Sequence, residues 1–159
     1  MVCVIVWANW PTAHLPIGSK ADSIVVEKGQ RTLTLLKNGA VLKTYHISLG
    51  KSPAGKKEKE GDQKTPEGIY HIIAHNPSSS FHRALRVSYP KQEDIDRAQM
   101  IGAKPGSDIM VHGMMNGFGF IGRVQSFVDW TAGCIALTNS EIEEIYDAVP
   151  DGTEIEIQE

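Results

Sequence analysis

The sequence predicts a mainly β domain with two short helices, and three observations lead to this class. From Ile24 onward, runs of alternating apolar and polar residues recur, which is the pattern of strands with one buried face. Asn38-Gly39 separates two such runs, and this dipeptide favours a hairpin because both residues tolerate a positive φ. Only two segments show the apolar spacing of a helix, at 92–101 and 140–148.

Seven strands are expected, and short turns join the first three. They cover residues 24–27, 32–36, 41–49, 68–75, 86–89, 108–111 and 153–157. Asn76–Ser80 is rich in turn formers and is expected to end the fourth strand. Residues 50–68 lack apolar periodicity, and a loop of that length is usually functional or disordered.

Capping signals support both helices. Ile95 and Ala98 share one face of the first helix, and Gly102 follows its end. Thr138 or Asn139 can cap the second helix. The glutamates in its first turn are favourable there, because the N-terminal end of the helix dipole is positive.

Length and composition indicate one globular domain that we expect to be monomeric. The 159 residues are enough for a self-sufficient core, and the net charge of −3 gives no basic surplus for nucleic acid. No run approaches the roughly 18 consecutive apolar residues that a transmembrane helix needs.

Residues 1–20 are expected to form an extension ahead of a single domain over 21–159. Val2–Ala8 is a short apolar run, and a polar stretch with prolines follows it to Gly18. The run resembles a weak or truncated signal peptide without a basic start, and its β-branched residues suit a strand equally well.

Cys134 and His112 carry the clearest chemical signal. A domain of this size needs no disulfide between Cys3 and Cys134, so a single functional thiol is the simpler interpretation. A nucleophilic cysteine needs a basic or cationic neighbour to hold it as a thiolate, and His112 is the candidate base. Gly133, without a Cβ, lets backbone N–H groups approach a developing oxyanion.

Each of these residues also has a structural alternative. Cysteine is among the most buried residue types, so Cys134 taken alone would be a core side chain. A tight turn around Gly133 would look the same in sequence. A zinc hydrolase is the alternative for the histidines, but His71 and His75, four apart, would converge on a metal only on a helix, and this segment is predicted to be a strand. We therefore expect no metal.

Two groups of residues resemble a known family. His112-Gly113, then Ile121-Gly122, then Thr131 and Gly133-Cys134-Ile135, are similar to the catalytic signature of the L,D-transpeptidases, the YkuD-type domain. Residues 61–70, which include Thr65-Pro66-Glu67-Gly68, resemble the Thr-Pro-x-Gly-aromatic turn of the same family. The resemblance runs from about Ile24 to Ile157. Ala132 and Ala136 depart from it, because the family usually has His and Arg at these positions.

The resemblance implies a β-sandwich-like catalytic domain in the periplasm or cell envelope. Cys134 would attack a peptidoglycan stem tetrapeptide, release D-alanine, and pass the acyl group to an amine, without a cofactor. The acceptor would be a second stem peptide, giving a 3–3 cross-link, or a lysine of an envelope lipoprotein. The alternatives are water, giving a carboxypeptidase or endopeptidase, and a binding module without turnover.

The resemblance also suggests roles for residues around the thiol. Thr131 and Gly113 would shape the substrate site, Trp130 would wall it or fill the core, and Arg123 would hold a substrate carboxylate or be a surface residue. The carbonyl of Gly113 would orient His112, with Asp129 and Asp108 as alternatives. The glycine-rich loop 113–122 is expected to be mobile.

Overall fold

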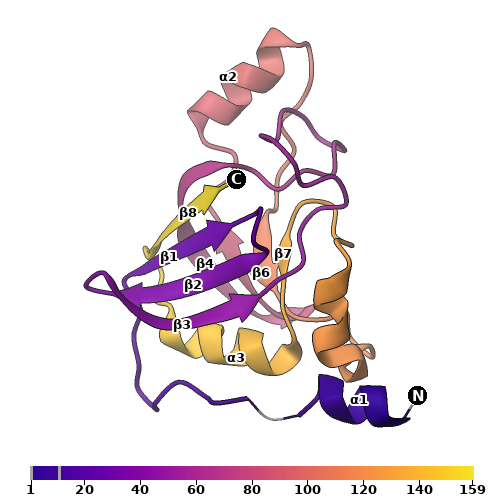
Figure 1. Cartoon of the computed structure of the whole chain (residues 1–159). Helices are drawn as coiled ribbons and strands as arrows, with labels where there is room; N and C mark the ends of the chain where they lie inside the picture. The colour runs from indigo at the N-terminus through magenta and orange to yellow at the C-terminus, as the bar shows by residue number, and fades with distance from the viewer. Residues whose placement is uncertain (1, 11) are drawn as a thin grey trace.

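The computed structural model describes residues 2–10 and 12–159, with backbone alone for residues 2 and 3 (Figure 1). Its strands are β1 (Ser23–Glu27), β2 (Thr32–Lys37), β3 (Ala40–His46), β4 (Gly68–Ser79), β5 (His82–Val87), β6 (Met110–His112), β7 (Ile135–Ala136) and β8 (Glu154–Gln158). Within the described residues they form one eight-stranded sheet in the order β3-β2-β1-β8-β4-β5-β6-β7. The mainly β class is confirmed.

The β2–β3 hairpin turns at the predicted dipeptide. Asn38 and Gly39 have φ values of 50° and 77°, the left-handed conformation that a tight hairpin needs. Along β2, Leu33 and Leu35 are buried while their neighbours are partly exposed, so the alternation in the sequence becomes one core face.

β4 is longer than expected, because it does not end at Asn76. The strand continues to Ser79, with Asn76 opposite Ala84 and Ser79 opposite His82 of β5. Pro77 lies between these two pairs, where the register of the β4–β5 ladder shifts. Because proline has no N–H to donate, it is tolerated at such a break in the ladder. β4 therefore belongs to both halves of the sheet.

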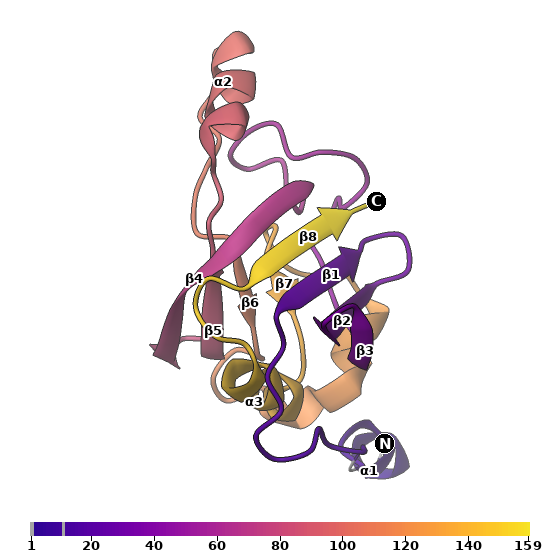
Figure 2. The ribbon, with the colours of Figure 1, turned by 90° about the vertical axis from the view of Figure 1, so that its left-hand side faces the viewer.

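The sheet curls so that its two ends meet. Beyond β3, Ser48 forms a bridge with Ala136 of β7, and Gly50 forms one with Thr131. Figure 2 shows the β3-β2-β1-β8 half inclined to the half that contains β5 and β6, with α3 (Asn139–Ala148) below them. The core between these layers includes Leu35, Ile47, Val111, Ile135 and Ile142.

Both predicted helices are present, as α2 (Gln92–Met100) and α3. Thr138 caps α3: its hydroxyl accepts a bond from the N–H of Glu141 at 3.3 Å, and its own N–H donates to the Glu141 carboxylate at 3.0 Å. α2 stands away from the sheet in Figure 1 and buries only Asp94 and Ala98, so Ile95 does not share the burial of Ala98.

Two further helical segments were not predicted. α1 (Val2–Ala8) is a helix, in which the backbone satisfies its own hydrogen bonds, and not the strand that its β-branched residues suggested. It lies beside the 3₁₀ segment η1 (Gly119–Phe127), where Trp7 stacks on Phe127 at 6.2 Å between ring centroids. Among the described residues, no helix has the length and apolar character needed to cross a bilayer.

Candidate active site

Parallel pairing of β6 and β7 brings His112 and Cys134 to the same face of the sheet. Val111 lies opposite Ile135, and His112 lies opposite Ala136. Side chains alternate along a strand, so Val111 and Ile135 point into the core, where both are fully buried. His112, at the end of β6, and Cys134, directly before β7, therefore share the other face.

His112 is held as a neutral base. Its side chain is only 2% exposed, and its Nδ1 lies 2.7 Å from the carbonyl oxygen of Gly113. A carbonyl only accepts, so Nδ1 carries the proton and Nε2 keeps its lone pair. Burial lowers the pKa of His112, which the bond to Gly113 only partly offsets. The imidazole is thus neutral at pH 7, ready to accept a proton at Nε2.

Two aromatic rings pack against the imidazole. Phe81 lies 4.5 Å from His112 between centroids, and Trp130 lies 5.8 Å away in an edge arrangement. Trp130 also donates from Nε1 to Gln125 at 3.1 Å. Phe81 was not predicted, because an aromatic in the turn between two strands has no periodicity to mark it. Both rings contribute to the burial of the imidazole.

Cys134 is a free, partly buried cysteine that rests as a thiol. Burial raises its pKa, against an opposing bond from the backbone of Met110, and the negative charge of Asp108 adds to the increase. Its Sγ donates to the carbonyl oxygen of Asp108 at 3.5 Å. The raised pKa favours the neutral thiol of Cys134 over the thiolate at rest. The side chain of Cys3 lies outside the described part of the chain.

Thr131 fixes the turn that precedes the thiol. Its hydroxyl donates to the Cys134 carbonyl at 2.7 Å and accepts from the N–H of Gly133 at 3.1 Å. The Gly133 N–H is thereby committed inside the turn, in contrast to the expectation that it faces the substrate. The N–H of Cys134 becomes the main backbone candidate for an oxyanion.

Gly133 packs backbone to backbone against the loop before β4. Its φ is 136°, and a Cβ there would lie 2.7 Å from the carbonyl oxygen of Lys64. The N–H of Gly50 donates to the hydroxyl of Thr65 at 3.1 Å, and Thr65 is fully buried. The Thr-Pro-x-Gly turn therefore forms one wall behind the thiol.

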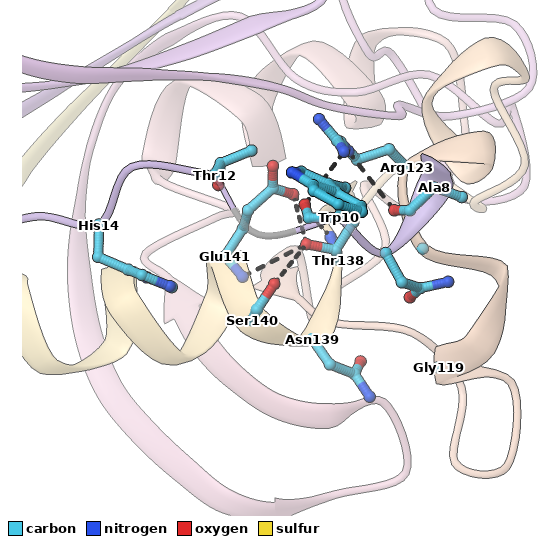
Figure 3. Close-up of a pocket in the computed structure, with 12 residues that line it drawn as sticks. Ala8, Trp10, Thr12, His14, Gly119, Arg123, Thr138, Asn139, Ser140 and Glu141 are labelled. Atoms are coloured by element: carbon cyan, nitrogen blue, oxygen red, sulfur yellow. Dashed lines mark hydrogen bonds between the residues drawn. The ribbon is translucent and has the colours of Figure 1, made fainter. Parts of the chain in front are cut away.

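Arg123 points away from this site. Its Nη2 donates to the carbonyl oxygens of Trp7 at 2.7 Å and Trp10 at 3.1 Å, and its guanidinium lies over the Trp7 ring. Figure 3 shows it reaching toward Ala8 and Trp10, in a pocket between the N-terminal segment and the start of α3. The expected substrate arginine therefore holds the N-terminal segment instead.

Gly113 lies within the expected site, and the glycine-rich loop after it leads into η1. The N–H of Gly113 donates to the carbonyl oxygens of Phe81 and Arg83 at 3.1 and 3.2 Å. Gly122 has a φ of 53° inside η1, where a Cβ would meet the backbone of Ala8. The glycines here allow close packing.

The other histidines of interest are engaged elsewhere. His75 lies 2.7 Å from an Asp151 carboxylate oxygen, and His82 lies 2.7 Å from Glu143. Among the described residues, no three His, Cys, Asp or Glu side chains gather as a metal site would require.

Fold and site together define a curled β domain in which a buried histidine ends one strand and a cysteine directly precedes the next strand of the sheet. The model of the L,D-transpeptidase catalytic domain family, YkuD, matches residues 21–157. The chain belongs to this family, as the motifs predicted.

Two curated relatives are similar in sequence. "Putative L,D-transpeptidase YafK" of Escherichia coli K12 is 30% identical over 132 residues, which cover 79% of this chain and 46% of YafK. "Putative L,D-transpeptidase YkuD" of Bacillus subtilis is 32% identical over 136 residues, which cover 84% of this chain and 64% of YkuD. The chain thus spans about half to two thirds of the length of these relatives.

Solved structures share the fold. The helical cell shape determining protein Pgp2 of Campylobacter jejuni superposes with a TM-score of 0.67 at 23% identity, over 99% of this chain and 55% of Pgp2. An L,D-transpeptidase of Mycobacterium smegmatis gives 0.57 at 21% identity, over 87% of this chain and 59% of that chain.

Proposed function

We propose that this chain is a cysteine-dependent L,D-transpeptidase that acts on peptidoglycan stem tetrapeptides in the periplasm or cell envelope. One observation carries the proposal: the neutral His112 has its Nδ1 fixed by the Gly113 carbonyl and shares a sheet face with the Cys134 thiol. Membership of the L,D-transpeptidase family supports the choice of substrate class.

The first half-reaction forms a thioester. Nε2 of His112 takes the thiol proton while Sγ of Cys134 attacks the carbonyl of the third residue, and the oxyanion faces the N–H of Cys134. The intermediate then collapses, the bond to D-alanine breaks, and His112 gives its proton to the leaving amine. Because neither partner is charged at rest, proton transfer must accompany attack.

The second half-reaction returns the thiol. An acceptor amine attacks the thioester carbonyl, His112 removes the amine proton, and the thiolate leaves and is reprotonated by His112. The acceptor is a second stem peptide, in a 3–3 cross-link, or a lysine of an envelope lipoprotein. Water in the same position gives the carboxypeptidase or endopeptidase reaction. The residues that act are the same in each case, and no cofactor takes part.

Mass spectrometry of the protein with a tetrapeptide muropeptide tests the proposal. We expect a tripeptide acyl adduct on Cys134, one D-alanine released per adduct, and products that identify the acceptor. Cys134→Ala should fold normally by circular dichroism and form neither adduct nor D-alanine. A folded wild-type protein that leaves the donor intact would favour the alternative, a binding module without turnover.

A further inference from the structure

We propose that the pocket between the N-terminal segment and the start of α3 is a second binding site, which takes a neutral, N-acetylated amino sugar of a glycan strand. Neither Cys134 nor His112 lines this pocket. The class of ligand follows from the side chains around it. The choice of an amino sugar among neutral sugars rests also on the proposed function, because peptidoglycan stem peptides are attached to strands of such sugars.

The pocket has the size of a small-molecule site. Its volume is about 340 Å³, and pockets that hold small ligands measure roughly 300 to 1,000 Å³. Figure 3 shows three parts of the chain around it: Trp10, Thr12 and His14 from the N-terminal segment, Arg123 from η1, and Asn139 and Ser140 from α3. Side chains that are distant in sequence thus converge on one cavity.

The N-terminal wall of the pocket is attached on both sides of the cavity. Nη2 of Arg123 donates to the carbonyl oxygen of Trp10 at 3.1 Å. Further along the chain, the N–H of Leu15 donates to the Glu144 carboxylate at 2.7 Å. These attachments favour binding, because a ligand would otherwise have to order the segment that receives it.

The charged groups around the pocket already have partners. The guanidinium of Arg123 donates to two backbone carbonyls. The carboxylate of Glu141 accepts from the N–H and the hydroxyl of Thr138 at 3.0 and 2.7 Å. Nδ1 of His14 lies 3.0 Å from the Glu144 carboxylate. A charged ligand would have to displace one of these partners before it could form an ion pair, so the pocket favours an uncharged ligand.

Uncharged polar groups around the cavity keep their bonding capacity for a ligand. Oδ1 of Asn139 accepts from the N–H of Met114 at 2.9 Å, whereas its Nδ2 makes no hydrogen bond within the described residues. The hydroxyl of Thr12 and the indole N–H of Trp10 also make none within residues 2–10 and 12–159. Such groups can bond to the hydroxyls of a sugar and to the carbonyl of its acetamido group.

Trp10 adds an apolar surface to this polar set. Its side chain is 66% exposed, and it lines the pocket. The face of an indole is electronegative, so it attracts the weakly positive C–H bonds on the face of a pyranose ring. A wholly apolar ligand would leave the donors of Asn139 and Thr12 without partners. A sugar satisfies both requirements, because it has an apolar face and a rim of hydroxyls.

Titration of the full chain with chitotetraose, a short strand of N-acetylglucosamine without peptide, tests the site. We expect binding at one site with a Kd of about 0.1 to 1 mM. Trp10→Ala should weaken binding about 10-fold, because the ring face is lost, and Trp10→Tyr should largely retain it. In NMR spectra the indole N–H signal of Trp10 should move most with added ligand, and those of Trp7 and Trp130 less.

Phe120→Ala is the matched control, because it removes an aromatic ring of η1 that is 58% exposed but does not line the pocket. This variant should keep the wild-type Kd. The proposal is overturned by a wild-type protein that does not bind chitotetraose, by a largest shift at Trp130, or by an equal loss in Phe120→Ala. Equal affinity for cellotetraose, which has hydroxyls in place of the acetamido groups, would overturn the assignment to an amino sugar.

The outcome of this titration is independent of the proposed function. Chitotetraose has no stem peptide, so its binding requires no reaction at Cys134. If the sugar binds and no tetrapeptide forms an adduct, the proposed function fails and the second site stands. If adducts form and the sugar does not bind, the second site fails alone.

Discussion

Burial moves the pKa values of Cys134 and His112 in opposite directions, and both shifts favour the uncharged form. Alkylation of Cys134 by iodoacetamide should therefore be slow at pH 7 and rise only above the ordinary thiol pKa of about 8.5. Protonated His112 cannot act as base, so kcat/KM should fall on acidification, with a midpoint below about 6.5. A plateau of alkylation between pH 6 and 7 would instead show a preformed thiolate.

Gly133 gives a second prediction at the level of one residue. Gly133→Ala should destabilise the domain by about 1 to 3 kcal/mol and reduce adduct formation, because the new Cβ meets the Lys64 carbonyl at a φ of 136°. Gly152→Ala is the control, since its φ of 88° is also positive but a Cβ there meets nothing within 4 Å. Urea unfolding compares the two, and equal losses would mean that backbone strain alone matters.

Sequence reasoning found Cys134 and His112 because both stand beside glycines in a recognisable order. It did not give their protonation states, since burial is a property of the packed structure. Phe81 carried no signal of its own, and Asp108 was expected only as an alternative partner of His112. These two residues come from separate segments, and only the folded chain shows that Phe81 packs on His112 and that the Asp108 carbonyl accepts from Cys134.

Among the elements, the second half of the loop between β3 and β4 is gathered around the Asp62 carboxylate. Asp62 accepts from Nζ of Lys57 at 2.7 Å and from the N–H groups of Glu58, Lys59 and Lys64 at 2.8 to 3.1 Å. Although burial acts against it, these bonds lower the pKa of Asp62. The loop that the sequence left as functional or disordered is thus an ordered support for the Gly133 turn.

Asp62→Asn should destabilise the domain by about 3 kcal/mol, because it leaves the buried ammonium of Lys57 without a counter-charge. A lowered carboxyl pKa contributes stability above the unfolded pKa of about 4 and loses it as pH falls through the folded value. The variant should therefore lose less stability than wild type on acidification below pH 4. Exposed Glu60→Gln is the control, and matching urea midpoints for both variants would contradict the assignment.

Element boundaries were predictable wherever alternation or a cap was clear, as in β2 and α3. β7 has only two residues, too few for any pattern, and η1 mixes apolar and polar residues with two glycines. The run Val2–Ala8 was interpreted as a signal-like segment or a strand, so its helix was not predicted. Its contact with η1 through Trp7 and Phe127 joins residues that no local pattern in the sequence connects.

At the scale of the whole molecule, Glu144 of α3 joins parts of the chain that are distant in sequence. Its carboxylate accepts from the N–H of Leu15 at 2.7 Å, from Nζ of Lys43 at 2.6 Å and from the hydroxyl of Tyr45 at 2.7 Å. The Glu144 carboxylate thus connects the N-terminal segment and β3 to α3. The sequence predicted an extension over 1–20 but not this attachment.

Glu144→Gln should cost about 3 kcal/mol of unfolding free energy and increase proteolysis ahead of Lys20, because the charged partner of Lys43 is lost. Burial opposes the shift, but the bonds from Lys43, Tyr45 and Leu15 lower the pKa of Glu144. The stability that Glu144→Gln loses is therefore the contribution that the ionised carboxylate makes above about pH 4. Glu143→Gln, which removes a more exposed neighbouring carboxylate, should change the unfolding free energy very little. A loss equal to that of Glu144→Gln would contradict the role of Glu144.

The position of β8 between β1 and β4 has a consequence for biosynthesis. β8 is the last strand of the sheet to leave the ribosome, yet it joins the two halves, pairing parallel with β1 and antiparallel with β4. Until it emerges, both halves present unpaired strand edges, which are prone to wrong pairing. Five residues, Glu154–Gln158, thus decide when the nascent chain can complete its sheet and bring the thiol to its final surroundings.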